Sequence, residues 1–363
     1  MSYAEPNFTR KQITRAGHTL VNLHASKAEK NDALALINHW RACHAYPINT
    51  FQSTLRSRLK KIDNDSIVAT RLKRIPSIEK KLIINSGMQL VRMQDVGGLR
   101  AIVSSLKNVR QLQSLYTNAG LSHELVATDD YIATPKPSGY RSLHLIYKYN
   151  NPNASIYNGL CLELQIRTKT QHLWATAVET VGTFLNQALK SSEGEEEWLE
   201  YFKAVGAAFS WLERSSVEQT FELLSQLEVY ELIKKLGEKL DVRTKLNAFS
   251  IAAQHINNKS SGSYHLIILN AAEKSVKINS FGLRRLEDAN LAYAKAEAFA
   301  SASEDDIQPV LVATDSMHKL RRAYPNYFLD TREFLKAISK IENAVMTGKV
   351  ANGARQQSLR GFS

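Results

Sequence analysis

Two segments in which apolar and polar residues alternate, 143–149 (LHLIYKY) and 160–168 (LCLELQIRT), constrain the fold more than any other feature. Alternation with a period of two is typical of β-strands, whose successive side chains point to opposite faces. Glu163, Gln165 and Arg167 therefore point the same way from a strand that is otherwise apolar. Charged groups buried without partners are costly, so we expect these side chains to contact ions or one another.

Apolar residues recur with near-helical spacing on both sides of these strands, which predicts helices there. The predicted helices are 26–44, a basic one that Asn49 or Thr50 can cap, 107–120, and the segment that follows Thr168. Pro47 is expected to end the first of them, and Pro76 could open a further helix. With 96–103 (VGGLRAIV) as another strand, the pattern predicts an α/β fold of the α+β type, a mixed sheet with flanking helices.

The second half of the chain repeats this mixture after a long helical region. SYHLIILN and SVKINSF predict a hairpin, LEDANLAYAKAEAFASA a helix, PVLVAT a buried strand, and TREFLKAISKIENAV a closing helix capped by Asp330. The predicted domains are an N-terminal helical region (1–44), a mixed-sheet domain (45–190), a helical bridge (191–260), a smaller C-terminal α/β domain (261–350) and a tail (351–363).

The charge balance narrows the class of partner, since the 363 residues carry a net charge of +12. Excess lysine and arginine favours nucleotides, nucleic acid or acidic membrane surfaces, while solubility alone is the plainer interpretation. No uncharged apolar run approaches the ~20 residues of a membrane helix and no secretory signal is visible, so we expect a cytoplasmic protein without membrane contact. Cys43 and Cys161 are expected to be buried thiols and not a disulfide.

Two separated carboxylates, Asp95 and Glu163, occur together with this surplus of cationic side chains. Carboxylates can hold Mg²⁺ while cations hold the phosphates that share it, which is the composition of a nucleotide phosphotransfer site. In the alternative interpretation, the two carboxylates form ion pairs with Arg100 and Arg167. Tyr140 would then serve packing alone. Composition does not separate the two interpretations.

Four segments, in the order RLKRIPSI, DVGGLRAIV, YIATPKPSGYRSLHL and ELQIRTKTQHLWA, resemble the synthetase domain of the RelA/SpoT homologue family. The resemblance covers about residues 40–185. It implies a nucleotidyltransferase-like fold and an ATP-dependent pyrophosphokinase, which moves pyrophosphate from ATP to a ribose 3′-hydroxyl and releases AMP. The chain lacks the His-Asp dipeptide of the family's hydrolase domain, so we expect synthesis without hydrolysis.

The resemblance also implies roles for individual residues. Asp95 and Glu163 match the magnesium-binding pair, and Glu163 could also help to deprotonate the attacking hydroxyl. Tyr140 matches a tyrosine that stacks on the acceptor base, and His144 accompanies it in the catalytic set. The implied ATP and phosphate contacts are Arg71, which stacks on adenine, and Lys73, Lys81, Arg100, Lys136, Arg141, Gln165 and Arg167. Glu179 matches a further acidic position.

Two further segments resemble a toxic branch of the same family. Residues 40–56 (WRACHAYPINTFQSTLR) resemble toxic small alarmone synthetases, several of which transfer pyrophosphate to the 3′ CCA end of tRNA. Tyr324 and Tyr327 in RRAYPNYFLDT resemble the Tyr-x-x-Tyr pair with which fused toxin–antitoxin proteins of the CapRel type occupy the adenine site. The implied partners are the tRNA acceptor end and a trigger protein of a phage, such as a capsid protein; no DNA partner is expected.

Three functions remain open on the sequence. The first is an autoinhibited toxin that blocks translation in defence against phage. The second is a synthetase of (p)ppGpp or (p)ppApp, which uses GDP, GTP or an adenosine nucleotide as acceptor and the C-terminal domain as regulator. The third is a catalytically inactive sensor that binds nucleotide or RNA. The active-site residues do not separate the first two, because both use one reaction.

Overall fold

The computed structural model of the chain describes residues 3–118, 121–184, 196–246, 264–270, 273, 275–282, 284–303, 307–313 and 331–347. Contacts between residues divide the chain into two compact units, each assembled from three segments. Unit 1 comprises Met1–Asp129, Leu143–Arg167 and Ile256–Tyr327, and unit 2 comprises Asp130–Ser142, Thr168–His255 and Phe328–Ser363. Each unit therefore draws on distant parts of the sequence.

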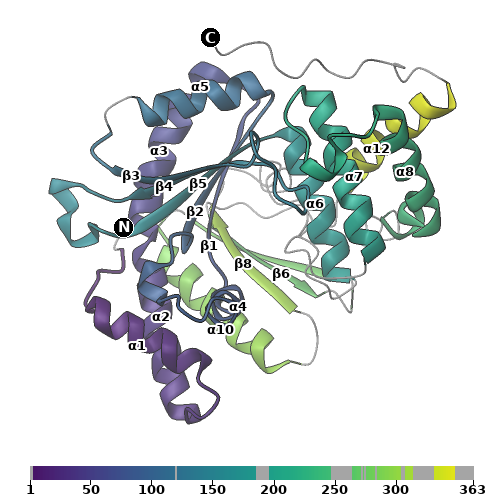
Figure 1. The fold of residues 1–363 in the computed structure, drawn as a ribbon. Coiled ribbons are helices and arrows are strands. Elements are labelled where there is room, and N and C mark those ends of the chain that lie inside the picture. Colours follow the sequence, from purple (N-terminus) through teal and green to yellow (C-terminus); the bar gives the residue numbers. More distant parts are fainter. Residues whose placement is uncertain are drawn as a thin grey trace. The chain divides into compact units, whose positions relative to one another are not determined.

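An eight-stranded sheet runs through unit 1 with the strand order β3-β4-β5-β2-β1-β8-β6-β7 (Figure 1). Its strands are β1 (Ile67–Leu72), β2 (Gly97–Val103), β3 (Glu124–Asp130), β4 (Leu143–Lys148), β5 (Cys161–Thr168), β6 (Tyr264–Asn270), β7 (Ser275–Phe281) and β8 (Ile307–Ala313). Antiparallel ladders join β1 to β2 and β8, β4 to β5, and β6 to both β7 and β8. The strands predicted from alternation and the α/β fold are confirmed.

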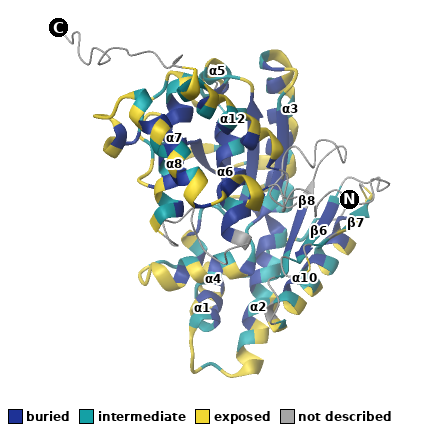
Figure 2. Ribbon diagram, turned by 90° about the vertical axis from the view of Figure 1, so that its right-hand side faces the viewer, coloured by how far each residue is buried: buried dark blue, intermediate teal, exposed yellow. Residues whose placement is uncertain are grey.

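The helices of unit 1 pack against this sheet or against one another, because each buries one apolar side. The described helices of unit 1 are α1 (Arg10–Val21), α2 (Lys27–Cys43), α3 (Ala45–Ile62), α4 (Ile75–Ile84), α5 (Leu106–Thr117) and α10 (Leu286–Ala302), with 3₁₀ turns η1 (Leu90–Arg92) and η2 (Pro152–Tyr157). Helix α3 packs against β1 and β2, while α10 packs against β6 and β8. In Figure 2, β6 and β8 are largely buried and α10 carries exposed positions on its outer side.

Pro47 does not separate two helices in the way the sequence predicts. Helix α2 ends at Cys43 and α3 begins at Ala45, so Pro47 occupies the first turn of α3. A proline is tolerated there because the first N–H groups of a helix have no partner within it. Two strands, β1 and β3, are not predicted from the sequence. Strand β1 runs into a strongly basic segment, and β3 is an exposed strand without apolar alternation.

Unit 2 is a helical assembly that includes the loop before β4. Its described helices are α6 (Lys169–Phe184), α7 (Glu196–Glu213), α8 (Gln226–Lys239) and α12 (Arg332–Met346), with the 3₁₀ turn η4 (Gln219–Phe221). Their shared core contains Trp174, Trp198, Phe202, Phe209 and Phe334. The N-cap of α12 is Thr331 and not Asp330, which lies outside the described residues.

The grouping in space differs from the order of the predicted domains. Strands β6–β8 extend the sheet of unit 1, whereas α12 packs with α8 in unit 2. The predicted boundaries stay a prediction, because compactness in space does not define how a chain divides into independent domains.

The two cysteines are free thiols, with Cys43 buried and Cys161 only partly buried. Within the described parts of the chain, no helix combines the length and the apolar character that crossing a membrane requires.

Candidate functional site

Asp95 is held between two lysines in unit 1. Lys73 Nζ donates to Asp95 Oδ2 at 2.7 Å, and Lys81 Nζ donates to Asp95 Oδ1 at 3.0 Å. Lys73 follows β1, where its backbone N–H donates to Val96 O at 2.8 Å, and Lys81 lies on α4. Asp95 precedes β2, so the pairing of β1 with β2 brings these side chains together. Each oxygen of this carboxylate therefore contacts a cation.

Burial and charge act in opposite directions on these groups. Burial raises the pKa of Asp95, but Lys73 and Lys81 outweigh it, so the pKa of this carboxyl lies below its usual value. Burial also lowers the pKa of Lys73, and the attraction of Asp95 offsets only part of that effect. Asp95 is therefore ionised at neutral pH, beside an ammonium group that is partly removed from water.

Glu163 lies on β5 in a row of polar side chains. Gln165 Nε2 donates to Glu163 Oε2 at 2.7 Å, and Arg167 Nη2 donates to Gln165 Oε1 at 2.7 Å. His144 Nδ1 lies 2.8 Å from Glu163 Oε1, because His144 on β4 is opposite Gln165 in the ladder. The predicted common direction of Glu163, Gln165 and Arg167 is confirmed, and they contact one another.

Hydrogen bonds determine the charge of Glu163. Burial raises the pKa of this carboxyl, but the bonds from His144 and Gln165 and the charge of Arg71 lower it from 4.5 to about 2. Glu163 is therefore an anion throughout the neutral range.

The two carboxylates belong to one charge cluster in unit 1. Strand β5 lies next to β2 in the sheet, and the charge of Glu163 raises the pKa of Asp95. Arg71 on β1 influences both halves of the cluster, since it lowers the pKa of Glu163 and that of Lys73. We call Arg71, Lys73, Lys81, Asp95 and Glu163 the charge cluster.

Arg100 lies on the same side of the sheet as Arg71. In the ladder Arg100 is opposite Ala69 and Arg71 is opposite Gly98, and residues two apart on a strand share a face. Arg100 is buried, while Arg71 is half-buried. Two of the predicted ATP contacts therefore project from one face of neighbouring strands.

The carboxylate pair fits magnesium bound together with a phosphorylated ligand. Mg²⁺ prefers oxygen ligands and is usually held by one or two carboxylates and by substrate phosphates. Among the residues that the structure describes, no group of three or more histidine, cysteine, aspartate or glutamate side chains could hold a metal. Asp95 and Glu163 would therefore supply only part of the coordination, and phosphate oxygens would supply the rest.

The loop before β4 belongs to unit 2 and contains a tight turn. Gly139 N donates to Lys136 O at 2.8 Å, and Lys136 N donates to Tyr140 O at 3.1 Å. Gly139 has a φ of +82°, a left-handed conformation that strains residues with a Cβ. A Cβ at this position would also lie 3.2 Å from Lys203 Cα on α7. Glycine therefore allows the loop and α7 to approach each other closely.

Tyr140 is packed in this structure, with 4% of its surface exposed. Its ring centre lies 6.2 Å from that of Trp174 and 6.0 Å from that of Tyr131, and Lys136 Nζ lies 5.7 Å from it. A base could stack on Tyr140 only after the ring is uncovered. Its role as acceptor platform stays a prediction, and the packing interpretation describes this conformation.

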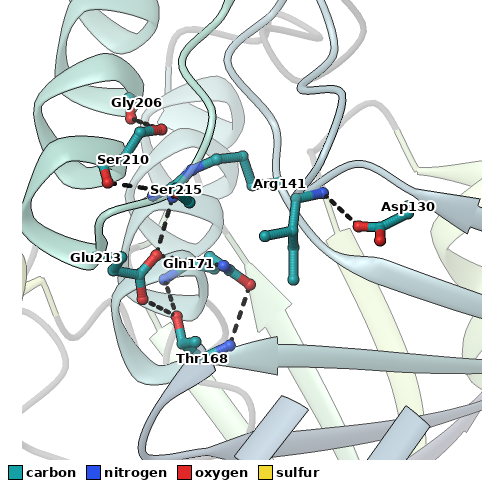
Figure 3. A network of polar contacts seen from close by, with 9 residues as sticks. Asp130, Arg141, Thr168, Gln171, Gly206, Ser210, Glu213 and Ser215 are labelled. Carbon is teal, nitrogen blue, oxygen red and sulfur yellow. Dashed lines mark hydrogen bonds and ion pairs between the residues drawn. The ribbon is translucent and has the colours of Figure 1, made fainter. Parts of the chain in front are cut away.

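Arg141, in the loop before β4, is buried beside the last residue of α7, Glu213. It belongs to the network of polar contacts that Figure 3 shows. Arg141 Nη1 donates to Glu213 Oε2 and to Ser215 Oγ, each at 2.9 Å. Glu213 also accepts hydrogen bonds from Thr168 Oγ1 and Gln171 Nε2. Glu213 therefore joins the loop to α6. Sequence reasoning misses Glu213, because no motif connects it with Arg141, 72 residues earlier.

The predicted site residues are divided between the two units. Unit 1 contains Arg71, Lys73, Lys81, Asp95, Arg100, His144, Glu163, Gln165 and Arg167. Unit 2 contains Lys136, Tyr140, Arg141 and Glu179, of which Glu179 is half-buried on α6. Tyr324 and Tyr327 lie outside the described residues.

Residues 70–182 match the sequence family described as the region found in RelA/SpoT proteins. The chain is 32% identical over 125 residues to the GTP pyrophosphokinase YwaC of Bacillus subtilis, covering 32% of this chain and 58% of that protein. It is 34% identical over 88 residues to the GTP pyrophosphokinase YjbM of the same organism, covering 24% of this chain and 41% of that protein. It is 30% identical over 142 residues to the GTP pyrophosphokinase of Escherichia coli K12, covering 38% of this chain and 17% of that protein.

The chain therefore spans 58% or less of the length of these relatives. Among solved structures, small alarmone synthetase 2 of Bacillus subtilis aligns with a TM-score of 0.41 and 23% identity, over 48% of this chain and 92% of that one. Small alarmone synthetase 1 of the same organism, bound to pppGpp, aligns with a TM-score of 0.42 and 24% identity, over 48% of this chain and 91% of that one. The predicted resemblance to RelA/SpoT proteins is confirmed for 70–182, while the resemblance to the toxic branch stays a prediction.

Proposed function

We propose that this chain is an ATP-dependent pyrophosphokinase, which transfers pyrophosphate from ATP to the 3′-hydroxyl of an acceptor and releases AMP. The observation that carries the proposal is the charge cluster, in which two ionised carboxylates lie among three cations. The whole cluster falls within 70–182, the part that matches the RelA/SpoT region. The names of the curated relatives support the same type of reaction.

In this proposal Asp95 and Glu163 hold Mg²⁺, whose charge offsets that of the phosphates. A pKa of about 2 suits Glu163 to this role, because a metal ligand must be ionised at neutral pH. The same pKa makes Glu163 a poor general base, since an effective base titrates near the working pH. Lys73 and Lys81 would exchange Asp95 for phosphate oxygens when the nucleotide binds.

As acceptor we propose the 3′ CCA end of tRNA. A net charge of +12 favours a polyanion over a small neutral ligand. On α3, Arg56 and Lys60 line a cavity of about 740 Å³, together with Asn49, Ser53, Asn64 and the acidic residue Asp63. Cationic and amide groups of this kind suit phosphate and sugar contacts.

The second candidate is a free nucleotide as acceptor. The curated relatives are named GTP pyrophosphokinases, which favours GDP or GTP with (p)ppGpp as product. An adenosine nucleotide with (p)ppApp as product uses the same chemistry.

We further propose that the C-terminal part restrains the enzyme until a phage protein, such as a capsid protein, binds it. Support comes from the position of β8, which precedes the tyrosine segment in the sequence. Val312 on β8 pairs with Arg71, the arginine assigned to adenine. Tyr324 follows Val312 by twelve residues, which can span up to about 40 Å. A span of this length is enough to connect Val312 with the predicted adenine site.

The acceptor is tested by incubating the purified chain, and a Tyr324→Ala/Tyr327→Ala variant, with ATP labelled in the γ-phosphate and with tRNA, GDP or GTP. Label on tRNA supports the first acceptor, and label on GDP or GTP alone excludes it. Asp95→Asn is the inactive control. No transfer to any acceptor by either protein would contradict the proposed reaction.

A further inference from the structure

Helix α4 has no anionic group of its own at its N-terminus. Its first turn contains no acidic residue, and its N-cap, Arg74, makes no side-chain capping bond. The first N–H group, that of Ile75, instead donates to Glu297 Oε1 at 3.0 Å. Glu297 lies on α10, 222 residues later in the chain. A carboxylate at a helix N-terminus accepts an otherwise unpaired N–H and offsets the positive end of the helix dipole.

Glu297 is fixed in place by a buried ion pair. Arg41 on α2 donates to both carboxylate oxygens, with Nη1 2.7 Å from Oε2 and Nη2 3.3 Å from Oε1. Arg41 Nη2 also donates to Tyr293 Oη at 3.0 Å. Arg41 is 2% and Glu297 is 5% exposed, and a two-pronged contact of this kind leaves the carboxylate little freedom.

The position of Glu297 on α10 is unusual for a charged residue. The buried positions of this helix include Leu286, Ala289, Tyr293 and Glu297, which recur every three or four residues. The first three are apolar or aromatic, and Ala289 and Tyr293 pack with Leu266 of β6 and Leu311 of β8. A glutamate on such a stripe is costly to bury unless its charge is paired. Here Arg41 of α2 and the N–H group of Ile75 in α4 both donate to it.

The segment from Thr70 to Arg74, which leads into α4, also contacts strand β8. Thr70 and Arg71 pair with β8, and Arg74 Nη1 donates to Gln308 Oε1 at 3.1 Å. The stretch from Thr70 to Ile75 carries two residues of the charge cluster, and Lys81 follows on α4. The geometry therefore links a segment outside the matched region to the residues assigned to ATP.

We propose that Glu297 is a positioning residue for the donor nucleotide: by fixing the N-terminus of α4, it sets Lys73 and Lys81 on the two oxygens of Asp95. This inference rests on the proposed function, because it assigns the cluster to ATP. Glu297 contacts neither nucleotide nor metal itself. It acts through Ile75, which lies two residues after Lys73 and six before Lys81. The C-terminal segment is then part of the ATP site, in addition to any restraint it imposes.

The test measures binding of a non-hydrolysable ATP analogue with Mg²⁺ to the full chain carrying Tyr324→Ala and Tyr327→Ala, which removes the proposed inhibitory rings, together with the KM for ATP and for the acceptor. Glu297→Gln should weaken analogue binding and raise the KM for ATP by about tenfold, the order expected for loss of a charged helix cap. The KM for the acceptor should stay unchanged. Glu287→Gln, an exposed glutamate in the first turn of α10, is the matched control and should alter neither.

Glu297→Gln leaves Arg41 buried without its counter-charge, so a second variant guards against simple unfolding. Arg41→Met with Glu297→Leu removes both charges and keeps apolar volume, which often preserves stability. It should unfold near the temperature of the unchanged chain and still bind the analogue about tenfold more weakly. Unaltered binding of the analogue by this folded variant would overturn the inference. Failure of the variant to fold would also overturn it, since the pair of Arg41 and Glu297 would then have only a structural role. A chain with Tyr324→Ala and Tyr327→Ala alone that binds no analogue would instead remove the proposed function, and this inference with it.

Discussion

Asp95 and Glu163 are both ionised, but for different reasons. Hydrogen bonds from His144 and Gln165 stabilise the ionised form of Glu163. The positive charges of Lys73 and Lys81 stabilise the ionised form of Asp95. Lysine side chains are flexible and can turn from a carboxylate to a phosphate. The contacts of Glu163 come from neighbouring strand positions and are less free to move. Under the proposed function, Asp95 is therefore the carboxylate whose surroundings should change most on nucleotide binding.

Replacing Glu163 with glutamine is expected to remove a pH-dependent part of the stability. The pKa of Glu163 falls from 4.5 in the unfolded chain to about 2 in the folded one, so its ionised form contributes about 3 kcal/mol above pH 5. This contribution is lost as the pH falls from 4.5 through 2. Urea unfolding should therefore show a larger difference between the unchanged chain and Glu163→Gln at pH 7 than at pH 3. Equal differences at the two pH values would contradict the lowered pKa.

Helix α7 is the element that holds the loop before β4. A Cβ at Gly206 on α7 would lie 3.0 Å from Gly139 O and 3.3 Å from Gly139 Cα. Trp174 Nε1 donates to Phe202 O at 2.8 Å beside this contact. Two glycines therefore let the loop and the helix touch through their backbones. The loop that carries Tyr140 takes its position from a helix outside the region that matches the family.

Gly206→Ala is expected to destabilise the chain by about 1–3 kcal/mol, because the added methyl group meets backbone and not a flexible side chain. Gly237→Ala on α8 is the matched control, since its Cβ would make an ordinary contact of 3.6 Å with Tyr201. Alanine there should leave the free energy of unfolding unchanged or raise it by about 0.5–1 kcal/mol. Urea unfolding of both variants checks this, and similar losses in the two would show that the contact with Gly139 is not what matters.

The sequence leads to some elements and not to others for identifiable reasons. Strands β4 and β5 are predictable because alternation fixes both their type and the face that Glu163 shares with Gln165. Strand β3 is not, because its exposed residues carry no apolar pattern. The bounds of α10 are predictable, but the bond from Ile75 to Glu297 is not, since distant partners leave no local pattern. A glutamate on the buried stripe of α10 is the signal that could have indicated it.

At the scale of the whole chain, segments outside 70–182 contact residues assigned to ATP and phosphate. In unit 1, β8 pairs with β1 at Arg71, and Glu297 bonds to α4. In unit 2, Glu213 on α7 bonds to Arg141 in the loop. A trigger that binds the C-terminal part would therefore have a physical route to the site. A near-complete switch requires that it favour the active state by about 5 kcal/mol.

Tyr324→Ala with Tyr327→Ala is expected to make the chain toxic to cells without any trigger, because the proposed occupants of the adenine site lose their rings. The measurement is growth after induction at matched protein levels. The same double variant with Asp95→Asn is the control and should permit normal growth. Normal growth with the double variant alone would remove the inhibitory role of these tyrosines.

The central claim is that Asp95 and Glu163 together hold Mg²⁺ over ATP, and calorimetric titration with a non-hydrolysable ATP analogue, with and without Mg²⁺, tests it most directly. The variant with Tyr324→Ala and Tyr327→Ala, which lacks the proposed inhibitory rings, should bind the analogue at least about tenfold more tightly with Mg²⁺. Asp95→Asn should lose this dependence, yet bind the metal-free analogue no more weakly, because Lys73 and Lys81 are released to the phosphates. Binding that ignores Mg²⁺ in this double variant, or keeps its dependence when Asp95→Asn is added to it, would contradict the account.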